Sequence, residues 1–129
     1  MAHYLFNFTE GDRRQAVERL RAKRWEVGLH EHYRDALAPG DLVLIYLAAP
    51  ESEFIGHAEL ATAADDNGVL LAHVEEWEPA VPMHAVVKRI DPTATNPLVQ
   101  RNAAVGFPLG IVRITADEYE AACALSRGR

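Results

Sequence analysis

Residues 24–59 contain three short stretches, RWEVG (24–28), LAPGDLVLIY (37–46) and FIGHAE (54–59), whose order predicts a small β-barrel. In the second stretch a Pro-Gly-Asp turn precedes a continuous apolar run, which is typical of a strand buried on both faces. The third stretch is a further strand, and the glycine within it indicates a bulge or a close approach of the backbone. The first stretch places Trp25 at the rim of this barrel, where an aromatic ring suits stacking on a flat ligand such as a nucleobase.

The rest of the chain supplies strands and helices on either side of this region. The aromatic segment Tyr4–Phe8 predicts a first strand. Thr9 is the expected N-cap of a helix that runs to about Lys23. Residues 29–38 read as a short helix or an irregular turn. Further elements are expected as a strand at 69–74 after an Asp-Asn-Gly turn, a short helix at 83–89, a loop through 102, a strand at 110–114, and a terminal helix opened by the capping box at 115–118.

Length, cysteine content and hydrophobicity narrow the class of protein. A chain of 129 residues has room for one domain, which we expect to span residues 1–129. The longest apolar run, 42–50, is too short to cross a bilayer, and the N-terminus lacks the pattern of a secretory signal. We therefore expect a cytoplasmic location without a membrane partner. Cys123 is the single cysteine, which excludes an internal disulfide and, among its alanine neighbours, favours a buried inert thiol.

Charge is distributed unevenly along the chain. The net charge of −6 argues against non-specific binding to long nucleic acid. Basic residues nevertheless concentrate between Arg13 and Arg24, where Glu18 is the single acidic residue. These arginines flank both sides of the apolar face of the helix, so they do not form one stripe. Either the helix is a solvated surface, or its basic side contacts a phosphate backbone. The candidates for that contact are Arg14, Arg21, Arg24 and Arg34.

The ordered set of elements resembles the EVE domain, a relative of the YTH domain within the PUA-like superfamily. The resemblance covers nearly the whole chain and rests on the segments 4–8, 25–28, 39–46, 54–59 and 110–119. It implies an α+β fold, a PUA-like mixed β pseudo-barrel flanked by helices. It also implies a module that binds a modified base of DNA or RNA, such as a methylated cytosine or adenine, in an aromatic cage. The base is held single-stranded or flipped out, and no cofactor or metal is implied.

The resemblance assigns roles to individual residues. Trp25 corresponds to the main stacking aromatic of the family, and Asn7 to a polar contact with the base edge. The backbone of Glu26, Val27 and Gly28 is expected to line the same wall. The family's methylated-adenine readers have a second cage tryptophan where this chain has the acidic turn at 65–68. The remaining candidates, for the other walls and for a phosphate contact, are His30, Tyr46, Arg101, Asn102 and Phe107.

Other interpretations of these residues remain open at the level of sequence. Trp25 and Tyr46 also suit the core, and His57 suits either the barrel mouth or the surface. His30 and its neighbour His32 read as loop histidines more readily than as metal ligands, because no third ligand stands at a known spacing. An enzyme related to the ASCH group is the alternative function, although neither lysine lies beside a well-placed carboxylate. A protein-interaction domain that kept the barrel is another, and fused relatives imply a partner nuclease or helicase.

Overall fold

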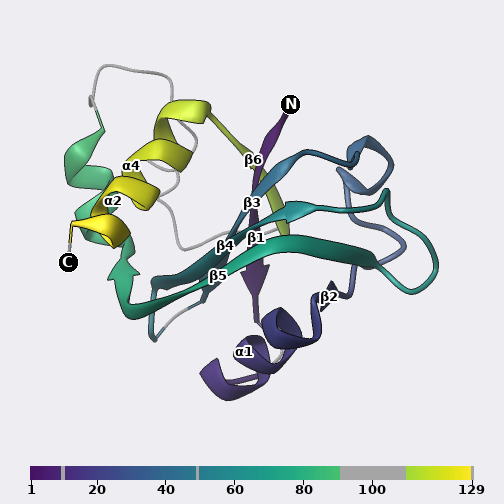
Figure 1. Cartoon of the computed structure of the whole chain (residues 1–129), viewed down its shortest axis with the longest axis horizontal. Coiled ribbons are helices and arrows are strands. Elements are labelled where there is room, and N and C mark those ends of the chain that lie inside the picture. The colour runs from purple at the N-terminus through teal and green to yellow at the C-terminus, as the bar shows by residue number, and fades with distance from the viewer. Residues whose placement is uncertain (10, 49, 91–109, 129) are drawn as a thin grey trace.

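The computed structural model describes residues 1–9, 11–48, 50–90 and 110–128. Together they form a mixed six-stranded sheet with the order β2-β5-β4-β3-β1-β6, curved into a half-barrel (Figure 1). Helix α1 covers one face of the sheet, whereas α2 and α4 lie together on the other. The elements are β1 (His3–Phe8), α1 (Arg13–Ala22), β2 (Arg24–Trp25), the 3-10 turn η1 (Arg34–Ala36), β3 (Leu42–Leu47), β4 (Glu53–Leu60), β5 (Val69–Pro82), α2 (Met83–Arg89), β6 (Ile111–Ile114) and α4 (Ala116–Arg127).

Strand β3, which the apolar run predicted, lies inside the sheet between β4 and β1. Strand β3 pairs in parallel with β1 and antiparallel with β4. Its side chains alternate between two cores, with Val43 and Ile45 in the core under α1, and Leu44 and Tyr46 in the core under α2 and α4. Burial on both faces explains why the run is continuously apolar. The prediction of a doubly buried strand is therefore confirmed.

The Pro-Gly-Asp turn before β3 is tied down by the Asp41 carboxylate. Its Oδ1 accepts a hydrogen bond from the Ala2 amide at 3.0 Å, and its Oδ2 accepts one from the Ala38 amide at 3.0 Å. The backbone of Asp41 also accepts from the Leu60 amide at 2.8 Å. One buried side chain thus joins the start of β1, the turn and, through its own backbone, the end of β4. The acid is needed because both oxygens act as acceptors at once.

Strand β5 is longer than the segment 69–74 that the sequence predicted. It continues to Pro82 although proline and charged residues follow Val74. Its pairing with β4 jumps from Glu76 to Val81, so Pro79 lies in a bulge where no ladder hydrogen bond is required of it. The expected irregularity at Gly56 is confirmed, because a Cβ atom there would lie 2.4 Å from the Glu75 carbonyl oxygen. Bulges therefore let one strand continue past residues that normally end it.

The observed helices match those predicted from the sequence, except at the N-terminal end of α1. Helix α2 has the predicted bounds, and α4 begins with the predicted capping box between Thr115 and Glu118. The N-cap of α1 is Asp12, however, so the expectation of Thr9 was wrong. The Asp12 side chain accepts from the Gln15 amide while the Gln15 side chain accepts from Asp12, a reciprocal pair that Thr9 does not offer. In the described part of the chain, no helix is both long and apolar enough to span a bilayer.

Cys123 is expected to react slowly with thiol reagents in the folded protein. It is buried in the core under α4, and this burial raises the pKa of its thiol to about 11, against a smaller opposite effect of a hydrogen bond with Tyr119. The thiolate is the reactive form, so at about pH 8 we expect modification roughly a hundredfold slower than in urea-unfolded protein. Titration with a chromogenic disulfide reagent measures both rates. Equal rates would contradict the buried placement.

Candidate ligand-binding cavity

Trp25 is placed by a sharp turn at the end of α1. Lys23 caps the helix in the left-handed conformation, with φ of 57°, and its amide donates to the carbonyl oxygens of the last turn. The chain then enters β2, where Trp25 pairs with Val69 of β5. Gly68 allows this pairing, because its φ is 95° and a Cβ atom there would lie 2.1 Å from the Trp25 carbonyl oxygen. The predicted hairpin turn and the position of Trp25 therefore depend on the same glycine.

The Trp25 ring forms part of an aromatic wall. Phe6 and Phe8 of β1 lie with their ring centroids 6.1 and 5.7 Å from that of Trp25. The Arg19 guanidinium covers the wall, 4.8 Å from the Phe8 centroid and 5.4 Å from the Trp25 centroid. Arg19 is also within 3.5 Å of the Glu26 carboxylate. With these neighbours Trp25 is only 5% exposed, so it belongs to the core and to the wall of a cavity at the same time.

That cavity has a volume of about 190 Å³ and lies between β1, the end of α1 and the segment after β2. It brings together five residues that the sequence singled out: Asn7, Trp25, Glu26, Val27 and Gly28. The residues that sequence reasoning missed are Phe8, Thr9, Arg19, Glu31, Gly110 and Ile111. No spacing in the sequence points to these, because they converge from four separate segments. Only the helical position of Arg19, one turn before the end of α1, offered a signal.

Asn7 and Tyr46 are neighbours on the sheet, yet they relate differently to the cavity. They are register partners in the parallel pair of β1 and β3, so their side chains lie on the same face. That face is the core under α2 and α4, where Tyr46 packs against Phe54 and where burial raises the pKa of its phenol. Asn7 borders the cavity, and its Oδ1 is buried without a partner among the described residues. Tyr46 thus lies in the core on the other face of the sheet from Trp25 and does not line the cavity.

The other predicted ligand contacts are not gathered at the cavity by the described structure. His30 is exposed in the turn after Gly28. Arg101, Asn102 and Phe107 lie outside the described residues. Among the residues that are described, no three histidine, cysteine, aspartate or glutamate side chains gather in a way that could hold a metal ion.

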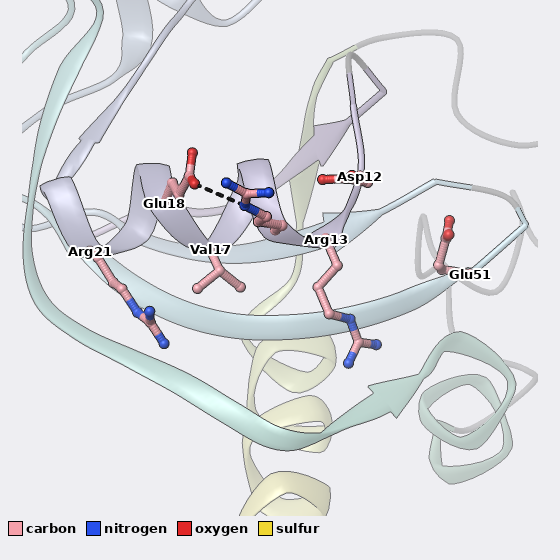
Figure 2. Close-up of a pocket in the computed structure, with 7 residues that line it drawn as sticks. Asp12, Arg13, Val17, Glu18, Arg21 and Glu51 are labelled. Carbon is pink, nitrogen blue, oxygen red and sulfur yellow. Dashed lines mark ion pairs between the residues drawn. The ribbon is translucent and has the colours of Figure 1, made fainter.

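The arginines proposed for backbone contacts lie on different surfaces. Arg14 and Arg21 line an open groove of about 720 Å³ along α1, and Figure 2 shows Arg13, Val17 and Arg21 pointing to the same side of this helix. The charges of the groove are largely matched. Arg13 pairs with Glu53, Arg14 with Glu18 at 3.4 Å, and Arg21 with Glu76 at 2.9 Å. Because each cation has a nearby carboxylate, the groove is a weak attractor for phosphate.

The two remaining arginines have different surroundings. Arg24 is exposed and borders the outer side of the aromatic wall beside Phe8 and Arg19. The Arg34 guanidinium is mostly buried and donates to the Asp65 carbonyl oxygen at 2.8 Å, so it holds the hairpin turn between β4 and β5. None of these four arginines is among the described residues that line the cavity beside Trp25, and Arg24 borders a neighbouring groove that shares Phe8, Arg19 and Glu26 with it.

His57 lies on the opposite face of the sheet, under α4. Its Nδ1 is 2.8 Å from the Tyr119 hydroxyl and its Nε2 is 3.1 Å from the Glu75 carboxylate. A neutral imidazole satisfies both contacts, accepting from the tyrosine and donating to the carboxylate. Burial raises the pKa of Tyr119, so this hydroxyl stays protonated and available as the donor. The half-buried His57 thus fixes α4 on the sheet rather than lining the cavity beside Trp25.

By sequence, the chain matches no protein-family model and no curated protein with significance. Solved structures match it closely in shape. Protein Rpa0253 of Rhodopseudomonas palustris is 19% identical, with 98% of this chain and 94% of that one covered and a TM-score of 0.67. Human THYN1, solved in complex with DNA that contains 5-methylcytosine, is 14% identical, with 98% of both chains covered and a TM-score of 0.68.

A third match reaches the ASCH group. The ASCH protein of Zymomonas mobilis is 11% identical, covers 96% of this chain and 95% of its own, and has a TM-score of 0.57. At identities this low, the structural matches establish a common fold and nothing about the ligand. These matches confirm the fold that the sequence predicted. Over nearly its whole length, the chain has the PUA-like fold of EVE-domain proteins.

Proposed function

We propose that this protein is a binding module that holds a modified nucleobase of DNA or RNA in the cavity beside Trp25. The observation that carries the proposal is the cavity itself, where an aromatic wall meets the backbone of Glu26–Gly28. Its volume of about 190 Å³ is below the range of sites for drug-sized ligands and suits a single heterocycle. Backbone groups at one edge and a ring face on another side are what a base needs for stacking and edge recognition.

Arg19 supports this use of the wall. Its guanidinium is planar and stacks over Phe8 and Trp25, so a flat group already occupies the face of the rings. A base entering the cavity takes the place of the guanidinium, which then turns toward solvent or toward the phosphate of the bound nucleotide. The ion pair of Arg19 with Glu26 is partly exposed and therefore contributes little resistance to this movement.

The comparison with THYN1 adds a candidate ligand. That protein has the same fold and was solved with DNA containing 5-methylcytosine. A methylated cytosine combines an apolar methyl group with a polar edge, and the cavity offers both Val27 and polar groups. The methyl group contributes only about 1 kcal/mol by burial, so the shape of the cavity must supply much of the selectivity.

Tryptophan fluorescence can test the proposal. In a Trp77→Phe protein, Trp25 is the sole reporter, and we expect its emission to be quenched by short single strands that carry one modified base. Removing the Trp77 ring nitrogen is tolerable because it is buried without a hydrogen-bond partner among the described residues. We expect Trp25→Leu to weaken binding roughly fivefold or more, since stacking on an aromatic contributes about 1–3 kcal/mol per base.

Trp77 provides the matched control. It is as buried as Trp25, at 5% exposure, but lies in the core on the opposite face. Trp77→Leu should therefore leave the affinity unchanged, and a Trp25→Phe protein that keeps Trp77 should show no quenching. Equal weakening by both leucine variants would mean that the effect is one of stability, and the stacking role of Trp25 would be abandoned.

A further inference from the structure

The side chain of Glu31 lies on the wall of the cavity against two glycines. A Cβ atom at Gly110 would lie 2.3 Å from Glu31 Oε1, and one at Gly28 would lie 3.6 Å from Glu31 Cγ. The backbone holds this position, because the Glu31 amide donates to the Gly28 carbonyl oxygen at 3.1 Å and the Glu31 carbonyl oxygen accepts from Arg34 at 3.2 Å. The missing side chains at both glycines thus provide the space in which the carboxylate is seated.

The Glu31 carboxylate has acceptor capacity to spare. None of the residues that the structure describes donates a hydrogen bond to it or forms an ion pair with it. The other acid of the cavity, Glu26, differs in being exposed and close to Arg19. The Glu31 residue is half-buried and its carboxylate has no protein donor, so a ligand that brings a donor to this point gives it a partner that the cavity does not supply.

The chemistry of that donor follows from the carboxylate, which when ionised only accepts hydrogen bonds. Cytosine and adenine, and guanine likewise, carry an exocyclic amino group on the edge used for pairing. Thymine and uracil have no amino group there, and their single N3–H donor lies between two carbonyl oxygens that repel a carboxylate. We propose that Glu31 is a specificity-determining residue that makes the cavity select bases with an exocyclic amino group and reject thymine and uracil. This inference rests on the proposed function, whose cavity and stacking residue it shares.

A pair of ligands tests for the amino group. 5-Methylcytosine and thymine have the same ring size and the same methyl group; they differ at the fourth ring position, in an amino group against a carbonyl oxygen, and at the third, in an acceptor nitrogen against an N–H. Single strands that differ only in this base also remove the cost of flipping a base out of a duplex. We expect wild type to prefer the 5-methylcytosine strand roughly tenfold or more, because a hydrogen bond to a charged group is replaced by repulsion.

Glu31→Gln should reduce this preference to less than about threefold, since an amide can also donate to the thymine carbonyl. Glu120→Gln, the same change on the outer face of α4, should keep the wild-type ratio. Gly110→Ala is a second route to the same effect, because its new methyl group displaces the Glu31 carboxylate. It provides the measurement if Glu31→Gln does not fold, which circular dichroism checks.

The outcomes separate the two proposals. If all proteins bind and Trp25→Leu weakens binding, but Glu31→Gln and Gly110→Ala keep the wild-type ratio, the role of Glu31 is overturned and base binding stands. A wild-type preference for thymine would overturn it as well. If wild type binds neither strand nor any other modified strand, the proposed function fails and the role of Glu31 fails with it.

Discussion

Replacing Trp25 by alanine is expected to lower the free energy of unfolding by about 3–5 kcal/mol, the usual effect of removing a large buried aromatic side chain. Trp25 is 5% exposed and packs on Phe6 and Phe8 while Arg19 covers it. The variant therefore loses dispersion contacts and one partner of a cation–π contact, and leaves a void at the edge of the sheet. Urea unfolding followed by circular dichroism measures the change.

The same position separates packing from ligand binding. Trp25→Phe keeps an aromatic ring in contact with the wall, and we expect it to recover more than half of the stability that alanine loses. A loss below about 1 kcal/mol for Trp25→Ala would contradict the packed position and indicate a ring that is free at the surface. A base that binds at the wall should raise the melting temperature of wild type, and raise that of Trp25→Ala much less.

Replacing Asp41 by alanine is the second large expected change, with a loss of about 2–4 kcal/mol in the free energy of unfolding. The variant leaves the amides of Ala2 and Ala38 without the acceptors that now lie 3.0 Å away, in a part-buried setting. It also releases the N-terminal end of β1 from the turn before β3. Thermal and urea unfolding both report the loss.

Two variants make this result specific. Asp41→Asn keeps the size of the side chain but retains one acceptor and turns a donor toward the second amide, so we expect about half the loss of alanine. Asp66→Ala, at an exposed position of the hairpin turn, should change stability by less than about 0.5 kcal/mol. If Asp41→Ala and Asp66→Ala were equally mild, the carboxylate would not be holding the turn.

Much of the fold follows from local patterns. The apolar run of β3, the Asp-Asn-Gly turn and the capping box before α4 each depend on a few adjacent residues, and the structure confirms all of them. The length of β5 depends instead on pairing with β4, which continues across two bulges. The N-cap of α1 is Asp12 rather than Thr9, because the Gln15 side chain and Asp12 cap each other. Features that depend on a single segment could therefore be predicted from the sequence.

The residues of the candidate site also fall into two groups, those that one stretch of sequence indicated and those that only the tertiary structure brought together. Trp25 and the backbone of Glu26–Gly28 were visible in one stretch of sequence, and the cavity includes them. The position of Arg19 over the rings and that of Glu31 beside Gly110 became visible only in three dimensions, because the first depends on the packing of α1 on β1 and the second on contact between segments almost 80 residues apart. The pairing of Arg13 and Arg21 with glutamates of β4 and β5 was equally hidden.

The sequence by itself determined the order of most strands and helices and the place of Trp25 directly after the first helix, because hydrophobic alternation, turn residues and caps act over a few residues. The tertiary structure alone decided which face each side chain serves, which arginines are neutralised, and that a carboxylate shares the cavity with Trp25. The physical reason is that charge pairing, stacking and cavity shape depend on distances between segments, and those distances are set only when the sheet has formed between its two cores.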